Sequence, residues 1–232
     1  MYSKETLESY ATFSNILKIL KRDPRFNEYC SQSRVAAGTS IPLSKERNAC
    51  YLLESGYVKY NFSGEDGMRN YYIVYPGRFI VLPIVQEYVP NTGELVFLNE
   101  SVYWTIDFEF LRKMLFNEDP RNYIMLHFSV ETRYKLYVLA TMRNITAEER
   151  VLFTLIRLAN FGMHVSANRV DLPSFITYNM VAKLAGTSKS FATLTLKNLR
   201  DKGILDSSKR PWVIEDMSFL QEALNISDIP SF

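Results

Sequence analysis

The sequence contains few of the residues that build metal centres and disulfide scaffolds. Its 232 residues include two cysteines, Cys30 and Cys50, and two histidines, His127 and His164. Without a Cys-x-x-Cys pair, this inventory is too small for a disulfide framework or a four-ligand zinc site. We therefore expect buried free thiols, no metal and no cofactor.

Long apolar runs are also missing. No segment approaches the roughly 20 apolar residues that a helix needs to cross a bilayer. The first ten residues, MYSKETLESY, are too polar for a signal peptide. The hydrophobic content of 47% nevertheless suffices for two domains with separate cores. We expect a cytoplasmic protein with no membrane partner.

The small net charge of +2 hides an uneven distribution along the chain. Residues 1–142 contain 16 Lys and Arg against 16 Asp and Glu, whereas residues 143–213 contain 11 against 5. The last residues, 214–232, contain no cation and 4 acids. A neutral first part followed by a basic segment is typical of a protein whose second domain binds nucleic acid.

The basic segment contains two short predicted helices joined by a tight turn, between Ile176 and Leu205. Thr177 can cap the first helix, and Gly186 can end it in the left-handed conformation that glycine adopts without strain. Thr187 or Ser188 can cap the second, which ends at Gly203. The residues expected to face the core are Met180, Val181 and Leu184 in the first helix, and Ala192, Thr195, Leu196 and Leu199 in the second.

This pattern predicts a helix-turn-helix whose second helix enters the major groove of DNA. The following residues, 204–217, read as a strand, a turn and a strand, and so as the wing of a winged helix. An ordinary helical hairpin is the alternative interpretation. The predicted DNA-binding residues are Ser188, Lys189, Ser190, Phe191, Thr193, Lys197 and Arg200 in the helix, and Lys209 and Arg210 in the wing.

The neutral part reads as an amphipathic helical stretch over residues 2–21 and then, from about Val35 to Asp107, as short apolar and β-branched runs. Turns are expected at Gly56, at residues 64–67 (GEDG), at 76–77 (Pro-Gly) and at 91–93 (Asn-Thr-Gly). Short strands with frequent turns predict a small antiparallel roll. Its many aromatic side chains could surround an apolar ligand, but we favour a roll filled by its own side chains.

A long helix is predicted over residues 121–142, and it carries too much apolar surface for one face. We infer a parallel homodimer built on this helix, the alternative being burial in one large core. The predicted dimer contacts are Tyr123, Ile124, Phe128, Tyr134 and Val138. Thr146 and Glu149 form a capping box that starts the next helix, so residues 144–146 are the expected hinge. The predicted domains are residues 1–118, 119–143 and 144–232.

Three stretches together resemble the Crp/Fnr family of bacterial transcription regulators. They are YLLESGYVKY with GEDGMRNYYIVYPGRFI, FLNESVYWTIDFEFLRKML, and ITAEERVLFTLIRLANFG followed by ITYNMVAKLAGTSKSFATLTLKNLRDKGIL. The resemblance implies an α+β chain with an N-terminal antiparallel β-roll like that of cyclic-nucleotide-binding domains, a long dimerisation helix and a C-terminal winged helix-turn-helix. It also implies a homodimeric regulator, not an enzyme, that binds a palindromic operator on double-stranded DNA. RNA polymerase is a further expected partner if the regulator is an activator.

The departures from the family pattern concern the ligand and the operator. The family holds a cyclic phosphate with an arginine, yet residues 79–97, FIVLPIVQEYVPNTGELVF, contain none, so we predict no response to cyclic AMP. Iron–sulfur centres need four thiolates, and a haem iron would have only His127, which reads better as a core residue. Lys189, Ser190 and Leu194 stand where the family commonly has Arg, Glu and Arg, so the operator cannot be inferred. Phe191 and Leu194 either contact thymine methyl groups or pack inside.

Two other functions are considered. The same DNA-binding regulator could act as a thiol redox sensor through Cys30 and Cys50. A cupin-like small-molecule binding protein would need a set of metal-binding histidines and carboxylates that the two histidines scarcely provide.

Overall fold

A computed structural model describes residues 2–43, 48–63, 69–82 and 93–224. Contacts between residues divide the chain into two compact units, Met1–Thr132 and Arg133–Phe232, which we describe separately. No helix in the described ranges is long and apolar enough to cross a membrane.

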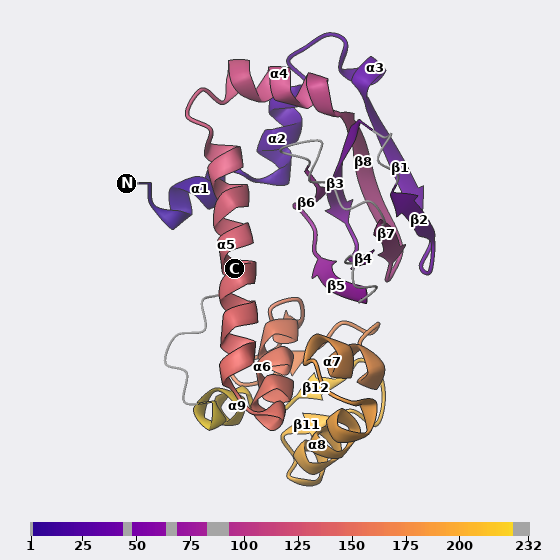
Figure 1. The fold of residues 1–232 in the computed structure, drawn as a ribbon, viewed down its shortest axis with the longest axis vertical. Helices are drawn as coiled ribbons and strands as arrows, with labels where there is room; N and C mark the ends of the chain where they lie inside the picture. Colours follow the sequence, from indigo (N-terminus) through magenta and orange to yellow (C-terminus); the bar gives the residue numbers. More distant parts are fainter. Residues whose placement is uncertain (1, 44–47, 64–68, 83–92, 225–232) are drawn as a thin grey trace. The chain divides into compact units, whose positions relative to one another are not determined.

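The first unit is built on two four-stranded antiparallel sheets, which confirms the predicted roll (Figure 1). Ten buried side chains from both sheets, including Leu53, Val58, Leu95 and Phe97, form one core cluster. The first sheet has the order β1 (Cys30–Val35), β8 (Ser101–Asp107), β3 (Ala49–Ser55) and β6 (Phe79–Val81). The second has the order β2 (Ser40–Leu43), β7 (Gly93–Phe97), β4 (Val58–Ser63) and β5 (Arg69–Val74).

Glycines make two of the predicted turns. Gly56 has φ +88°, and a Cβ there would lie 2.0 Å from Ser101 Oγ, so no other residue fits without rearrangement. Gly77, after Pro76, has φ +84°. The turn expected at residues 64–67 and most of the one at 91–93 lie outside the described residues.

The helical prediction for residues 2–21 was wrong in one respect, since two helices occupy this stretch. They are α1 (Lys4–Tyr10) and α2 (Phe13–Leu20). The chain breaks at Ala11 because the Thr12 hydroxyl accepts a hydrogen bond from the Asn15 amide at 3.3 Å and so caps a new helix.

Two further helices complete the roll's cover. These are α3 (Phe26–Tyr29) and α4 (Phe108–Glu118), the latter capped by Asp107, which accepts from the Phe110 amide at 2.8 Å. Helices α2 and α4 pack together, and α4 also contacts β3 and β8 (Figure 1). Their buried residues share one core cluster with Cys30, Cys50 and Ile106 of the first sheet.

The long helix α5 (Tyr123–Asn144) begins at a buried carboxylate. Asp119 is 1% exposed and accepts hydrogen bonds from the amides of Tyr123 at 3.0 Å and Ile124 at 2.9 Å. The boundary between the two units falls inside this helix. The predicted capping box follows its end: Thr146 accepts from the Glu149 amide, Glu149 accepts from the Thr146 amide, and α6 (Ala147–Ala159) starts there.

The second unit combines helices with a small sheet. After α6 come α7 (Tyr178–Leu184), α8 (Lys189–Asp201) and α9 (Met217–Ala223). The sheet has the order β11 (Leu205–Asp206), β12 (Val213–Ile214), β10 (Val170–Asp171) and β9 (Met163–His164). The predicted helix-turn-helix and strand-turn-strand are present, whereas β9 and α9 had not been predicted.

Candidate nucleic-acid interface

The turn between α7 and α8 has the predicted construction. Thr177 caps α7 by accepting from the Met180 amide at 3.1 Å, and Gly186 ends it with φ +59°. The Thr187 amide then donates back to the Ala182 carbonyl at 2.9 Å, which closes the helix end. Val181 and Ala182 are buried, whereas Met180 and Leu184, also predicted to face the core, are half-buried.

Arg150 of α6 holds this turn in place, a role that the sequence did not indicate. Its Nε donates to the Ala185 carbonyl at 2.9 Å and its guanidinium also reaches the carbonyls of Ile145 at 3.2 Å and Gly186 at 3.5 Å. A cation is favourable at the C-terminal end of a helix, where carbonyls lack partners within the helix. Arg150 is therefore a positioning residue for the start of α8.

Helix α8 has one buried and one exposed face. The four residues predicted to be buried, Ala192, Thr195, Leu196 and Leu199, are each at most 5% exposed. Ser188 caps the helix by accepting from the Phe191 amide at 3.2 Å. The predicted DNA-facing residues share the exposed face: Ser188, Lys189, Ser190, Phe191, Thr193, Lys197 and Arg200.

The short hydroxyl side chains of this face are partly engaged within the helix. Thr193 Oγ1 donates to the Lys189 carbonyl at 2.7 Å, and the hydroxyls of Ser188 and Ser190 are 3.1 Å apart. In contrast, over the described part of the chain Lys189 and Lys197 form no ion pair within 4.0 Å. Within the described residues, these two lysines thus present positive charge that no carboxylate pairs with.

The wing between β11 and β12 presents two more exposed cations, Lys209 and Arg210. Asp206 shapes its first half by accepting from the Ser208 amide at 2.9 Å, and the hydrogen bonds from Ser208 lower the pKa of the Asp206 carboxyl. Tyr178 of α7 attaches the wing to the helix-turn-helix, since its hydroxyl lies 2.8 Å from Ser207 Oγ. Its ring also meets that of Trp212 edge to face, with centroids 4.7 Å apart.

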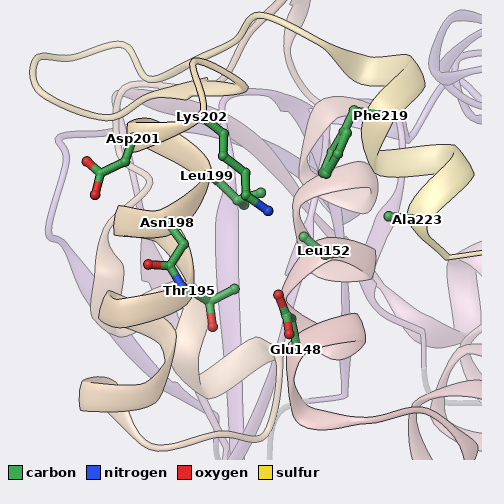
Figure 2. A pocket seen from close by; sticks show the side chains of 9 residues that line it. All are labelled: Glu148, Leu152, Thr195, Asn198, Leu199, Asp201, Lys202, Phe219 and Ala223. Atoms are coloured by element: carbon green, nitrogen blue, oxygen red, sulfur yellow. The ribbon is translucent and has the colours of Figure 1, made fainter.

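A pocket of about 300 Å³ lies between α6, α8 and α9 (Figure 2). Its apolar lining comes from Leu152, Leu199 and Phe219, and the amino group of Lys202 lies 5.7 Å from the centre of the Phe219 ring. The remaining lining residues are Glu148, Thr195, Asn198, Asp201 and Ala223. The pocket thus involves the later turns of α8 and none of residues 188–191, which start the helix.

The residues predicted to form a dimer interface on α5 differ in their burial. Ile124 and Val138 are 2% and 3% exposed, and Tyr123, Phe128 and Tyr134 are half-buried. The large apolar residues of this helix that are exposed are Leu136 at 61%, Tyr137 at 45% and Leu139 at 59%.

The two cysteines lie on opposite sides of one strand. Cys30 of β1 and Cys50 of β3 are both paired with Ile106 of β8. Because neighbouring strands are about 4.8 Å apart, their Cα atoms are separated by about 10 Å, more than the ~7 Å that a disulfide can bridge. Burial raises the pKa of the Cys30 thiol to about 12 and raises that of Cys50 as well. These are the properties of unreactive core thiols.

A buried polar cluster joins α5 to the strand region of the first unit. Arg78, directly before β6, pairs with Glu131 of α5 at 2.6 Å, and its Nε lies 3.0 Å from the Tyr75 hydroxyl. The side chains of Arg78 and Glu131 are only 19% and 13% exposed. His127, one turn before Glu131, is 4% exposed, and its Nε2 has no hydrogen-bond partner among the described residues. Burial and the charge of Arg78 lower the pKa of His127 to about 4.

Comparison with solved structures identifies similar folds at low sequence identity. A cyclic-nucleotide-binding-domain protein from Listeria monocytogenes superimposes with a TM-score of 0.74 at 21% identity, over 89% of this chain and 98% of that one. The c-di-GMP-responsive global regulator CLP from Xanthomonas campestris gives 0.64 at 17% identity, over 85% and 98%. TTHB099, a transcriptional regulator of the CRP family from Thermus thermophilus, gives 0.64 at 18% identity, over 83% and 96%.

No protein-family model matches the sequence, and the comparison with curated proteins gives no match. The structural likeness shows the fold, which is the one that the resemblance to Crp/Fnr regulators had implied.

Proposed function

We propose that this protein is a sequence-specific DNA-binding transcription regulator rather than an enzyme. The observation that carries the proposal is the exposed face of α8, where Lys189 and Lys197 form no ion pair with any described residue and lie opposite a buried, mainly apolar stripe. A wing with Lys209 and Arg210 belongs to the same compact unit. A helix-turn-helix with such a face binds the major groove, and the wing cations bind flanking phosphates.

The cations of α8 and of the wing make two kinds of contact with DNA in this proposal. Lys189, the first residue of α8, is in position to reach base edges, because the N-terminal residues of a recognition helix enter the groove most deeply. Lys197 and Arg200, further along the helix, and the two wing cations bind phosphates. Phosphate contacts supply affinity for any sequence, whereas base contacts supply the preference for one.

The regulator acts as a homodimer on a palindrome with half-sites about one helical turn apart. The exposed Leu136, Tyr137 and Leu139 of α5 support this part of the proposal, because a second copy of the helix would remove their apolar surface from water. Two of the solved structures of similar fold are described as regulators, which supports the regulatory role but says nothing of the dimer.

The proposed regulator does not respond to cyclic AMP. Arg78, the arginine nearest the region that holds the phosphate in the family, is already paired with Glu131. Much of that region, residues 83–92, lies outside the described residues.

The two alternative functions receive less support. The separation and raised pKa values of Cys30 and Cys50 count against a thiol redox sensor. The cupin-like alternative has only the two histidines of the sequence as candidate metal ligands of that type.

Selection of binding sites from randomised double-stranded DNA, at one stated salt concentration, tests the proposal. We expect a two-fold symmetric motif. Lys189→Ala should weaken binding to the motif more than binding to random DNA, whereas Lys209→Ala with Arg210→Ala should weaken both and reduce the salt dependence. Lys18→Ala, which removes an exposed cation of the first unit, is the matched control and should change neither. Equal losses on both DNAs for Lys189→Ala would contradict the base-reading role.

A further inference from the structure

Two large apolar side chains are exposed on the first turns of α8. Leu194 is 58% exposed and Phe191 is 39% exposed. Neither is needed to fill the core behind the helix, because that side is already closed by Ala192, Thr195, Leu196 and Leu199. Apolar surface at this position therefore remains in water until something covers it.

The polar side chains around them offer little for reading bases. The segment from Lys189 to Thr195, KSFATLT, contains no Arg, Asn or Gln, which form paired hydrogen bonds with bases, and no Asp or Glu, which accept from cytosine. The hydroxyl of Thr193 donates to the Lys189 carbonyl, and Ser190 interacts with the capping Ser188. Lys189 is thus the one side chain of this segment with a charged donor for a base.

Only one apolar group lies on the base edges of the major groove, the C5 methyl of thymine. Ser190, Thr193 and Leu194 are all exposed on the same turns, so a helix that places Lys189 and Ser190 at base edges also brings Leu194 to the groove floor. Contact between the methyl group and the leucine side chain removes apolar surface of both from water.

We infer that Leu194, with Phe191 beside it, is a specificity-determining residue that reads thymine methyl groups, so that the operator half-site contains thymines at fixed positions. This inference rests on the proposed function and concerns the sequence class that the same helix prefers. Hydrogen bonding contributes less to the preference than it does in helices that carry arginine or glutamate at these positions.

Replacing thymine by deoxyuridine tests the inference, because it removes the C5 methyl and leaves base pairing unchanged. The selected motif is synthesised with deoxyuridine at one conserved thymine at a time, and its affinity is compared with that of the thymine DNA. Removing a methyl that is buried in the complex should weaken binding about fourfold, the equivalent of ~0.8 kcal/mol. At least one position per half-site should show this loss.

The Leu194→Ala variant identifies the side chain that makes the contact. It should bind the thymine DNA more weakly than the wild type and should no longer distinguish the deoxyuridine DNA at that position. Phe191→Ala should abolish the distinction at a different thymine or reduce it at the same one. Phe116→Ala, which removes an 81% exposed aromatic ring from α4 in the other unit, is the control and should retain the full difference.

Failure of the inference is distinguishable from failure of the proposed function. If a symmetric motif is selected but deoxyuridine costs nothing, or costs as much in Leu194→Ala as in the wild type, the methyl reading is overturned and the regulator stands. If no motif is selected and binding depends on salt alone, the proposed function fails and the inference fails with it.

Discussion

The buried charged cluster of the first unit and the exposed cations of α8 in the second differ in how their charges are satisfied. In the first unit Arg78 and Glu131 are less than one-fifth exposed and paired with each other, and His127 is buried beside them. In the second unit Lys189 and Lys197 are exposed, and within the described ranges no carboxylate pairs with them. The first arrangement satisfies its charges internally, whereas the second leaves them for a partner.

Substitution of a charged residue should therefore have different consequences at the two places. Removing one member of a buried pair leaves the other uncompensated in a region of low dielectric constant, so the protein loses stability. Removing an exposed cation costs little stability and instead weakens binding to a polyanion. Four measurements test these expectations.

The largest effect is expected for Glu131→Leu. The substitution keeps most of the side-chain volume but leaves the Arg78 guanidinium buried without its carboxylate, which should lower the free energy of unfolding of the first unit by about 3 kcal/mol. Urea unfolding followed by Trp104 fluorescence in a Trp212→Phe background reports on this unit, because the other tryptophan is then absent.

The matched control is Glu100→Leu. Glu100 pairs with Arg34 in the same unit, but the side chains are 65% and 74% exposed, so we expect a loss of less than about 1 kcal/mol. Combining Arg78→Met with Glu131→Leu should restore much of the lost stability, since no unpaired charge remains. Equal losses at Glu131 and Glu100 would remove the distinction between the two kinds of ion pair.

The next largest effect is expected in the pH dependence of the stability of the first unit. The pKa of His127 is about 4 in the folded protein and near 6.5 when unfolded, so between these values the unfolded chain binds a proton that the folded chain does not. Stability should therefore fall as the pH is lowered through this window, by about 1.6 kcal/mol between pH 6.5 and 5. His127→Phe should remove this dependence, whereas His164→Phe, at an exposed strand residue, should retain it. A pH profile that is the same in His127→Phe and in the wild type would show that the buried imidazole is not its source.

The features predicted correctly from the sequence depend on neighbouring residues. Thr177 caps α7, Gly186 ends it, and Thr146 with Glu149 starts α6, because a cap involves residues three positions apart. The buried stripe of α8 follows from the helical period in the same way. Hence the helix-turn-helix of the second unit and the exposed face of α8 could be predicted from the sequence, whereas β9 and α9 of the same unit were not.

The features missed depend on residues far apart in the chain. The contact of Arg150 with the carbonyls of Ala185 and Gly186, and the pairing of Arg78 with Glu131, leave no local pattern. Strand β1 pairs along β8, and little in its polar sequence, CSQSRV, indicated a strand. The break at Ala11 is different, since the cap at Thr12 is a local signal that the apolar periodicity obscured.

Arg150→Met should have a smaller effect than the loss of Glu131. The methionine keeps the apolar stem of the side chain but removes the donors to the carbonyls at the end of α7, at a cost of about 1.5 kcal/mol in the second unit. Trp212 fluorescence in a Trp104→Phe background measures it. We also expect weaker binding to the selected DNA motif, because α8 begins at this turn. Arg150→Lys retains the charge but not the planar donor geometry, so its stability and DNA affinity should lie between those of the wild type and Arg150→Met.

The smallest effect is expected when the folded protein is exposed to thiol reagents or to oxidation. Because Cys30 and Cys50 are buried and their pKa values are raised, a thiol reagent at neutral pH should label neither in the folded protein and both in urea. Mass spectrometry distinguishes these states, and DNA binding should be the same under oxidising and reducing conditions. A mass lower by two hydrogens after mild oxidation would instead mean that the strands on both sides of β8 separate in solution. The core of the first unit would then be accessible to oxidation, and the thiol-sensor alternative would regain support.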